Sequence, residues 1–132
     1  MLLPFFMLYH GSCKKITKLE PKPARGVGKA QDKLVAVYAT HHKAFAQLFA
    51  IPLLPAETGS IRWKTVMQDE KICMILQEGK VDFNSTGYLY KFTDVGFRQI
   101  DELQWIRKTS VLVFNWEEVD PKKMRDRIII HE

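Results

Sequence analysis

The stretch Leu8-Tyr9-His10-Gly11-Ser12, close to the start of the chain, decides the expected fold. The apolar residues 5–9 lead into it and predict a buried strand that ends at His10 and Gly11. A glycine at this point lets a ligand approach the backbone closely, and its N–H and C=O groups can hold a carboxamide. The same pair is also compatible with an ordinary turn, so the motif alone leaves both interpretations open.

A second stretch, Val37-Tyr38-Ala39-Thr40, follows the long connection formed by residues 14–33. Residues 34–38 are rich in β-branched side chains and predict a strand. Thr40 suits a helix N-cap, and residues 41–50 have the apolar periodicity of a helix. At the strand end, the phenol of Tyr38 can present a flat face to an aromatic ring, or it can be a half-buried core residue.

The middle of the chain has strand patterns. Alternating apolar residues predict strands over 61–67 and 72–76, and Asp69-Glu70 between them predicts a tight hairpin. Residues 84–87 read as a turn. The strand expected after this turn places three aromatic side chains on one face, namely Tyr88, Tyr90 and Phe92.

The last third predicts two more strands, over 103–106 and 111–116, and a short C-terminal helix that opens at Asp120-Pro121. The whole pattern is α+β, with about six or seven mostly antiparallel strands and one principal helix. The length of 132 residues is that of one domain with one core, so residues 1–132 are expected to form a single domain.

The net charge of +5 is concentrated in one connection. Residues 14–33 hold seven Lys or Arg against two acidic residues, while basic and acidic residues balance in the rest of the chain. This segment is either a solvated loop or a site for an anion such as a pyrophosphate or a nucleic acid.

The two N-terminal stretches resemble motifs of the ADP-ribosyltransferase superfamily. The resemblance is to the branch shared by diphtheria toxin and the poly(ADP-ribose) polymerases, whose signature is His, Tyr, Glu. His10-Gly11-Ser12 resembles the first motif, and residues 37–40 with the Ala-rich helix behind them resemble the second. The resemblance covers residues 5–50.

This resemblance implies a fold of split antiparallel β-sheets and an enzyme that transfers ADP-ribose from NAD to an acceptor, with release of nicotinamide. His10, Gly11 and Ser12 would then line the NAD site. Gly11 would bind the nicotinamide amide through its backbone, His10 would contact a ribose, and Tyr38 would stack on the nicotinamide. A shift of one residue would place Val37 where the family has its tyrosine, and the nicotinamide would lose its stacking partner.

The third family residue is a glutamate at the start of a late strand, where it stabilises the positive charge that develops as nicotinamide leaves. Glu102, at the start of the strand expected over 103–106, is the candidate for this catalytic role beside His10 and Tyr38. Asp101 would point to the opposite face. Glu117 and Glu118 follow the last strong strand pattern and fit less well.

The basic connection 14–33 would lie over the NAD in such a fold, where Arg25 and Lys29 could reach the pyrophosphate. Two alternatives stay open. The chain could be a degenerate binding or interaction module that keeps the fold without catalysis, or a nucleic-acid-binding or RNA-modifying domain that uses the basic connection. The acceptor, whether protein, nucleic acid or small molecule, and the oligomeric state are not determined by the sequence.

Other features of the sequence restrict the class of protein. There is no apolar run of about 18 residues, so no membrane span is expected. The two cysteines do not form a disulfide framework and no export signal is evident, which favours the cytoplasm. His41 and His42 are adjacent on the expected helix and diverge by about 100°, so no metal site is expected.

Overall fold

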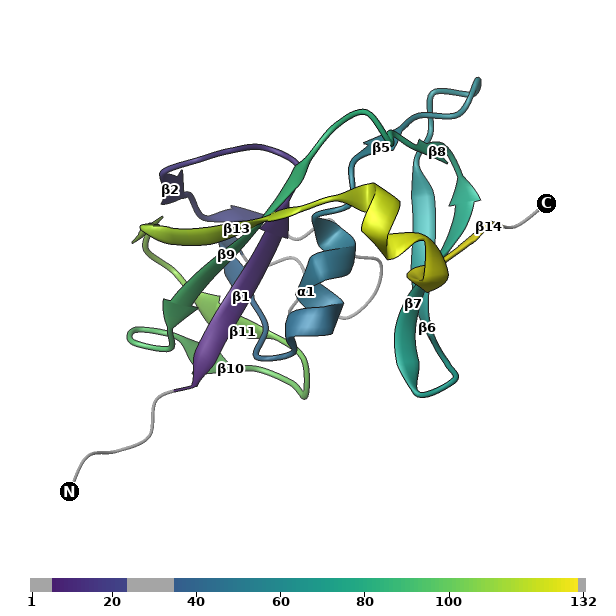
Figure 1. Ribbon diagram of the computed structural model, residues 1–132. Helices are drawn as coiled ribbons and strands as arrows, with labels where there is room; N and C mark the ends of the chain where they lie inside the picture. The colour runs from purple at the N-terminus through teal and green to yellow at the C-terminus, as the bar shows by residue number, and fades with distance from the viewer. Residues whose placement is uncertain (1–5, 24–34, 131–132) are drawn as a thin grey trace.

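The computed structural model describes residues 6–23 and 35–130. It shows the expected α+β class, built from mostly antiparallel sheets with one α-helix and one 3₁₀-helix in those residues (Figure 1). The strands are short and numerous, and they are distributed over several small sheets.

The elements follow one another along the chain in three groups. The first group is β1 (Met7–Ser12), β2 (Lys18–Leu19), β3 (Lys22–Pro23), β4 (Val35–Ala39), α1 (Lys43–Phe49) and β5 (Leu53–Leu54). The second is β6 (Arg62–Gln68), β7 (Lys71–Glu78), β8 (Lys80–Val81) and β9 (Gly87–Thr93). The third is β10 (Arg98–Gln99), β11 (Trp105–Arg107), β12 (Val111–Leu112), β13 (Asn115–Val119), the 3₁₀-helix η2 (Pro121–Arg127) and β14 (Ile128–Ile130).

The sheet that carries His10 has the strand order β1-β9-β13. β1 runs antiparallel to β9, with His10 opposite Tyr90. The three aromatic residues expected on one face of β9 do lie together, because Tyr88 and Phe92 pack against the apolar cluster that buries Tyr90. The side chains of β9 therefore alternate between its two faces as the sequence predicts.

The second sheet has the order β10-β11-β4-β3, and Tyr38 on β4 lies opposite Ile106 on β11. The two sheets meet where Tyr9 and Thr40 exchange a pair of backbone hydrogen bonds, 2.7 and 3.0 Å long. Beyond this bridge β1 and β4 belong to different sheets. The two sheets therefore separate next to His10 and Tyr38, and this place is called the split between the sheets.

Helix α1 packs on β1, and two glycines make this contact possible (Figure 1). A Cβ atom at Gly11 would lie 2.8 Å from the backbone nitrogen of Ala50 and would overlap the carbonyl oxygen of Ala46. A Cβ atom at Gly87, on β9, would overlap the carbonyl oxygen of Ala50. The helix backbone thus rests directly on the sheet backbone, and any larger residue at either position would push it away.

The N-terminus of α1 corrects a sequence prediction. The N-cap is His42, whose Nδ1 atom accepts a hydrogen bond from the backbone N–H of Phe45 at 3.1 Å, and Thr40 is not the cap. Thr40 bonds Tyr9 through its backbone and therefore stays extended, so the helix begins later. The Thr40 hydroxyl instead accepts from the N–H of His42 at 3.1 Å.

The predicted hairpin at Asp69-Glu70 is confirmed, because β6 and β7 pair on either side of it and both residues have positive φ, 52° and 64°. Such angles are those of a two-residue type I′ turn. The predicted strand over 111–116 is wrong as one element: β12 pairs with β2 and β13 with β9, so the chain changes partners between them. β14, which runs parallel to β7, lies beyond the predicted elements.

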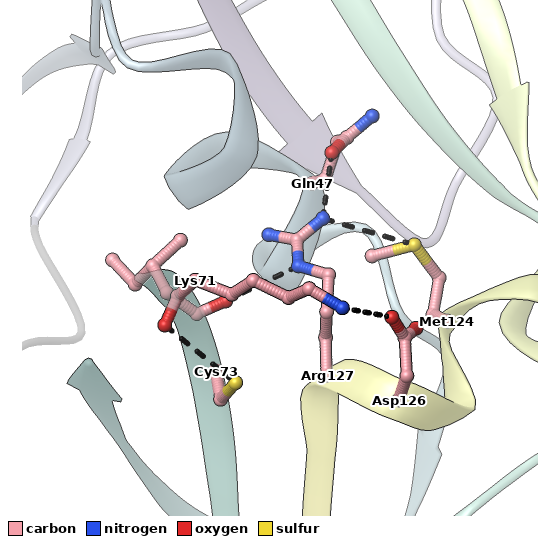
Figure 2. A network of polar contacts seen from close by, with 7 residues as sticks. Gln47, Lys71, Cys73, Met124, Asp126 and Arg127 are labelled. Carbon is pink, nitrogen blue, oxygen red and sulfur yellow. Dashed lines mark hydrogen bonds and ion pairs between the residues drawn. The ribbon is translucent and has the colours of Figure 1, made fainter. Parts of the chain in front are cut away.

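The predicted C-terminal helix is present as η2. The Asp120 side chain accepts from the N–H of Lys122 at 3.0 Å and Pro121 occupies the first turn, as the sequence indicates. Arg127, at its end, then connects three elements (Figure 2). Its Nε atom donates to the carbonyl of Ile72 on β7 at 3.1 Å, and its Nη1 atom donates to Oε1 of Gln47 on α1 at 2.8 Å.

The Nη2 atom of Arg127 also donates to the carbonyl of Ala44, so one half-buried guanidinium connects the C-terminal segment to both α1 and β7. The planar guanidinium of an arginine carries five N–H donors in a fixed fork, which lets it reach three acceptors on different elements at once. The helix, the β6–β7 hairpin and the C-terminal strand are therefore held in one arrangement by this side chain as well as by the apolar cluster between them.

We predict that Arg127→Lys lowers the free energy of unfolding by about 1.5–3 kcal/mol, because a lysine cannot replace the charged hydrogen bonds on both sides. Urea unfolding measures the change. Arg125→Lys is the matched control: Arg125 is exposed and lies over the Phe83 ring, a contact that lysine also makes, so its effect should stay within about 0.5 kcal/mol. Equal losses in the two variants would contradict the role assigned to Arg127.

Candidate functional site

His10 is half-buried and is fixed by one hydrogen bond at the split between the sheets. Its Nδ1 atom lies 2.7 Å from the backbone carbonyl oxygen of Tyr38. A carbonyl oxygen can only accept, so Nδ1 carries the proton and donates it. In the neutral ring this leaves Nε2 without a proton, as a hydrogen-bond acceptor.

Three effects set the charge of this imidazole. Burial lowers the pKa of His10, the hydrogen bond to the Tyr38 carbonyl opposes that effect, and the positive charge of Lys22 on β3 adds to the lowering. The net pKa lies below the usual value, so the ring is neutral at neutral pH. The arrangement therefore offers a fixed, uncharged acceptor and disfavours a histidinium.

The backbone of Gly11 points into the same region. The N–H and C=O of Tyr9 bond Thr40, which places them on the side of β1 that faces away from β9. In an antiparallel ladder these groups alternate in direction, so the N–H and C=O of Gly11 point to that side too. Pairing of β1 with β4 ends at the Tyr9–Thr40 bridge, and the Gly11 groups therefore lie along the edge where the sheets separate.

The reason for a glycine at position 11 differs from the expected one. Its missing side chain makes room for the backbone of α1 at Ala46 and Ala50, on the face of β1 that the helix covers. The helix backbone fills this space, so a ligand cannot approach Gly11 from the side-chain direction as the sequence suggested. The N–H and C=O groups of Gly11 can still bind a ligand. They lie in the plane of the sheet, whereas the helix covers the position of the missing side chain, which projects out of that plane.

The two alternatives at the second motif have different surroundings. Val37 is 2% exposed and belongs to the apolar cluster with Tyr90. Tyr38 projects from the opposite face of β4, because successive strand residues alternate, and it is half-buried. Val37 is thus a core residue, and Tyr38 is the one of the two with a side chain that solvent reaches.

Ser12 closes β1 beside the site. Its hydroxyl oxygen accepts a hydrogen bond from the backbone N–H of Lys14 at 3.1 Å, which turns the chain out of the strand. The next residues are fixed by Tyr90, whose hydroxyl donates to the carbonyl of Lys14 at 2.8 Å and accepts from the N–H of Ile16 at 2.6 Å. A buried phenol therefore sets the path of the chain that leaves the His-Gly motif.

The prediction that Glu102 opens a strand is wrong. The strand begins at Trp105, and Glu102 is exposed at the tip of the turn between β10 and β11. Asp101 causes this turn: its Oδ1 atom accepts from the backbone N–H groups of Leu103 and Gln104, at 2.9 and 2.7 Å. A short polar side chain that bonds the backbone two and three residues ahead competes with strand pairing.

Glu102 accordingly lies by the first turn of α1, where it and Phe45 line one shallow depression. The His10 ring is bonded to the backbone carbonyl of Tyr38. The two side chains themselves project from opposite faces, because Tyr9 pairs with Thr40 and side chains alternate along both strands. Glu102 lies beside the helix.

Glu117, which the sequence places after the last strong strand, in fact lies on β13. It bonds Lys43 of α1 and Lys91 of β9, each at 3.1 Å. Burial alone would raise the pKa of this carboxyl group, but the hydrogen bonds from the two lysines lower it below its usual value. Glu117 thus joins helix to sheet on the face opposite His10, which the alternation along β13 could have indicated.

The described part of the basic connection is partly engaged. Lys18 forms an ion pair with Glu20 at 3.1 Å, and Lys15 lies over the ring of Trp116, 5.0 Å from its centroid. Lys22 acts on His10 through its charge. The predicted pyrophosphate contacts, Arg25 and Lys29, lie outside the described residues.

Three further findings concern the class of protein. Neither helix within residues 6–23 and 35–130 has the length and apolar character that a membrane crossing requires. The same residues contain no group of three or more His, Cys, Asp or Glu arranged to hold a metal ion. Comparison of the chain with protein-family models, with curated proteins and with solved structures finds no match.

Proposed function

We propose that this chain binds NAD at the split between the two sheets and that it transfers ADP-ribose from NAD to an acceptor. The observation that carries the proposal is the 2.7 Å hydrogen bond from Nδ1 of His10 to the carbonyl of Tyr38. It fixes the ring in the tautomer whose Nε2 atom accepts, and a ribose hydroxyl can donate its proton to such an acceptor.

The neighbouring groups fit the nicotinamide end of the same molecule. A carboxamide has one N–H₂ donor and one C=O acceptor, and the edge of Gly11 offers one C=O and one N–H on the open side of β1. Tyr38 adds an aromatic ring on the adjoining strand. A neutral imidazole also suits a nicotinamide ring, which is positively charged in NAD, because no histidinium opposes it.

The transfer step has simple requirements. The bond between the nicotinamide nitrogen and its ribose breaks, nicotinamide leaves with the bonding electrons, and the acceptor nucleophile bonds to the ribose carbon and loses a proton. A carboxylate beside the ribose stabilises the positive charge that develops. Glu102, exposed at the tip of the turn between β10 and β11, is the candidate for that carboxylate.

The proposal places this activity in the cytoplasm. Cys13 and Cys73 are both free thiols in the described part of the chain, and free thiols persist in a reducing compartment.

For NAD binding, we predict that a tenfold excess of NAD over its dissociation constant raises the melting temperature by about 4–6 °C. His10→Asn is the decisive variant. Its amide N–H₂ occupies the position of Nδ1 and can still donate to the Tyr38 carbonyl, but it has no counterpart of Nε2. We expect a nearly unchanged melting temperature without NAD and a shift that is largely lost with NAD.

His41→Asn is the control for this experiment, since His41 bonds the Trp105 indole and lies outside the proposed contacts. Its response to NAD should equal that of the wild type. A wild-type protein that shows no shift at millimolar NAD would contradict the proposal.

For transfer, we predict that the wild type releases nicotinamide from NAD and that Glu102→Gln slows this release at least about a hundredfold while keeping the NAD-induced shift. Glu118→Gln, an exposed carboxylate on β13, should release nicotinamide at the wild-type rate. If the wild type binds NAD but is as inert as Glu102→Gln with protein and nucleic-acid acceptors, the chain is a binding module and the transfer step is refuted.

A further inference from the structure

Three cationic side chains converge on one depression at the β10–β11 end of the second sheet. Arg98, Arg107 and Lys108 line an open hollow of about 410 Å³, together with the turn at Val95 and Gly96. No lining residue is acidic. A linear charge pattern does not indicate this group, because basic and acidic residues balance over the region outside 14–33.

Arg107 is held in position within this hollow. Its Nε atom donates to the hydroxyl of Thr109 at 2.9 Å, and its Nη1 atom donates to the carbonyl of Val95 at 3.2 Å. Gly96, with φ of 81°, lies beneath the guanidinium, and a Cβ atom there would approach Arg107 side-chain atoms to 3.3–3.4 Å. Five N–H groups belong to a guanidinium, so the remaining ones stay available in a fixed orientation.

The three cations of this cluster have no ion-pair partner within residues 6–23 and 35–130. The ion pairs among the described residues use Lys18, Lys43, Arg62, Lys71 and Lys91, and none involves Arg98, Arg107 or Lys108. Arg107 donates hydrogen bonds to a hydroxyl and a carbonyl. Both acceptors are uncharged, so they do not neutralise its positive charge. Like charges that share a hollow repel one another, and a bound anion relieves this repulsion.

We propose that the hollow lined by Arg98, Arg107 and Lys108 binds a phosphate group. Phosphate carries several acceptor oxygens and more charge than a carboxylate, and an oriented arginine fork with two flexible cations beside it matches that chemistry. The phosphate can belong to a nucleic-acid backbone or to a small phosphorylated molecule. The inference shares no residue with the NAD proposal and does not rest on it.

The test uses the full chain with two probes, a fluorescent short single-stranded RNA and inorganic pyrophosphate, at low ionic strength. Arg98→Gln with Lys108→Gln removes two exposed charges from the hollow, and Lys122→Gln with Lys123→Gln removes two exposed charges from η2. Arg107→Lys keeps the charge and removes the fork. We expect the first pair and Arg107→Lys each to weaken binding about tenfold, and the η2 pair to weaken it less than about twofold.

The outcomes separate the sources of the phosphate. RNA binding that Arg98→Gln with Lys108→Gln weakens assigns the hollow to a nucleic-acid backbone, and the dependence of RNA affinity on salt concentration should then be smaller in that variant than in the wild type. Pyrophosphate binding without RNA binding assigns it to a small molecule. Equal weakening by the two double variants, or no binding of either probe by the wild type, would overturn the proposal. Neither probe contains nicotinamide, so failure of NAD binding leaves this test unaffected.

Discussion

The hydrogen bond from Nδ1 of His10 to the carbonyl of Tyr38 is the interaction on which the proposed site depends. It acts beside the Tyr9–Thr40 bridge, where the sheet of β1 meets the sheet of β4, and it fixes one imidazole tautomer because a carbonyl oxygen can only accept. Burial then keeps the ring uncharged. From this single contact follow the acceptor character of Nε2 and the case for a ribose-binding group.

Gly11 shows how one residue meets two demands in different directions. Perpendicular to the sheet, its missing side chain lets the backbone of α1 rest on β1. Within the sheet, its N–H and C=O lie on the edge where β1 and β4 separate. A larger residue would move the helix, and the contact of α1 with Arg127 and Glu117 would move with it.

The sequence predicted what local physics decides. The type I′ turn at Asp69-Glu70 and the Asp120 cap depend on neighbouring residues and are confirmed, as is the α+β class. The place of Glu102 was missed because the Asp101 side chain replaces strand pairing with a turn. The cationic hollow arises from residues that pairing of β10 with β11 brings together, which no linear charge pattern contains.

The most direct test of the central claim is the protonation state of the His10 ring, measured by long-range ¹H–¹⁵N NMR at neutral pH and assigned with the His10→Asn variant. We predict a neutral imidazole with its proton on Nδ1 and a bare Nε2, whose nitrogen shift changes when NAD is added. A proton on Nε2, or a charged ring at neutral pH, would contradict the account.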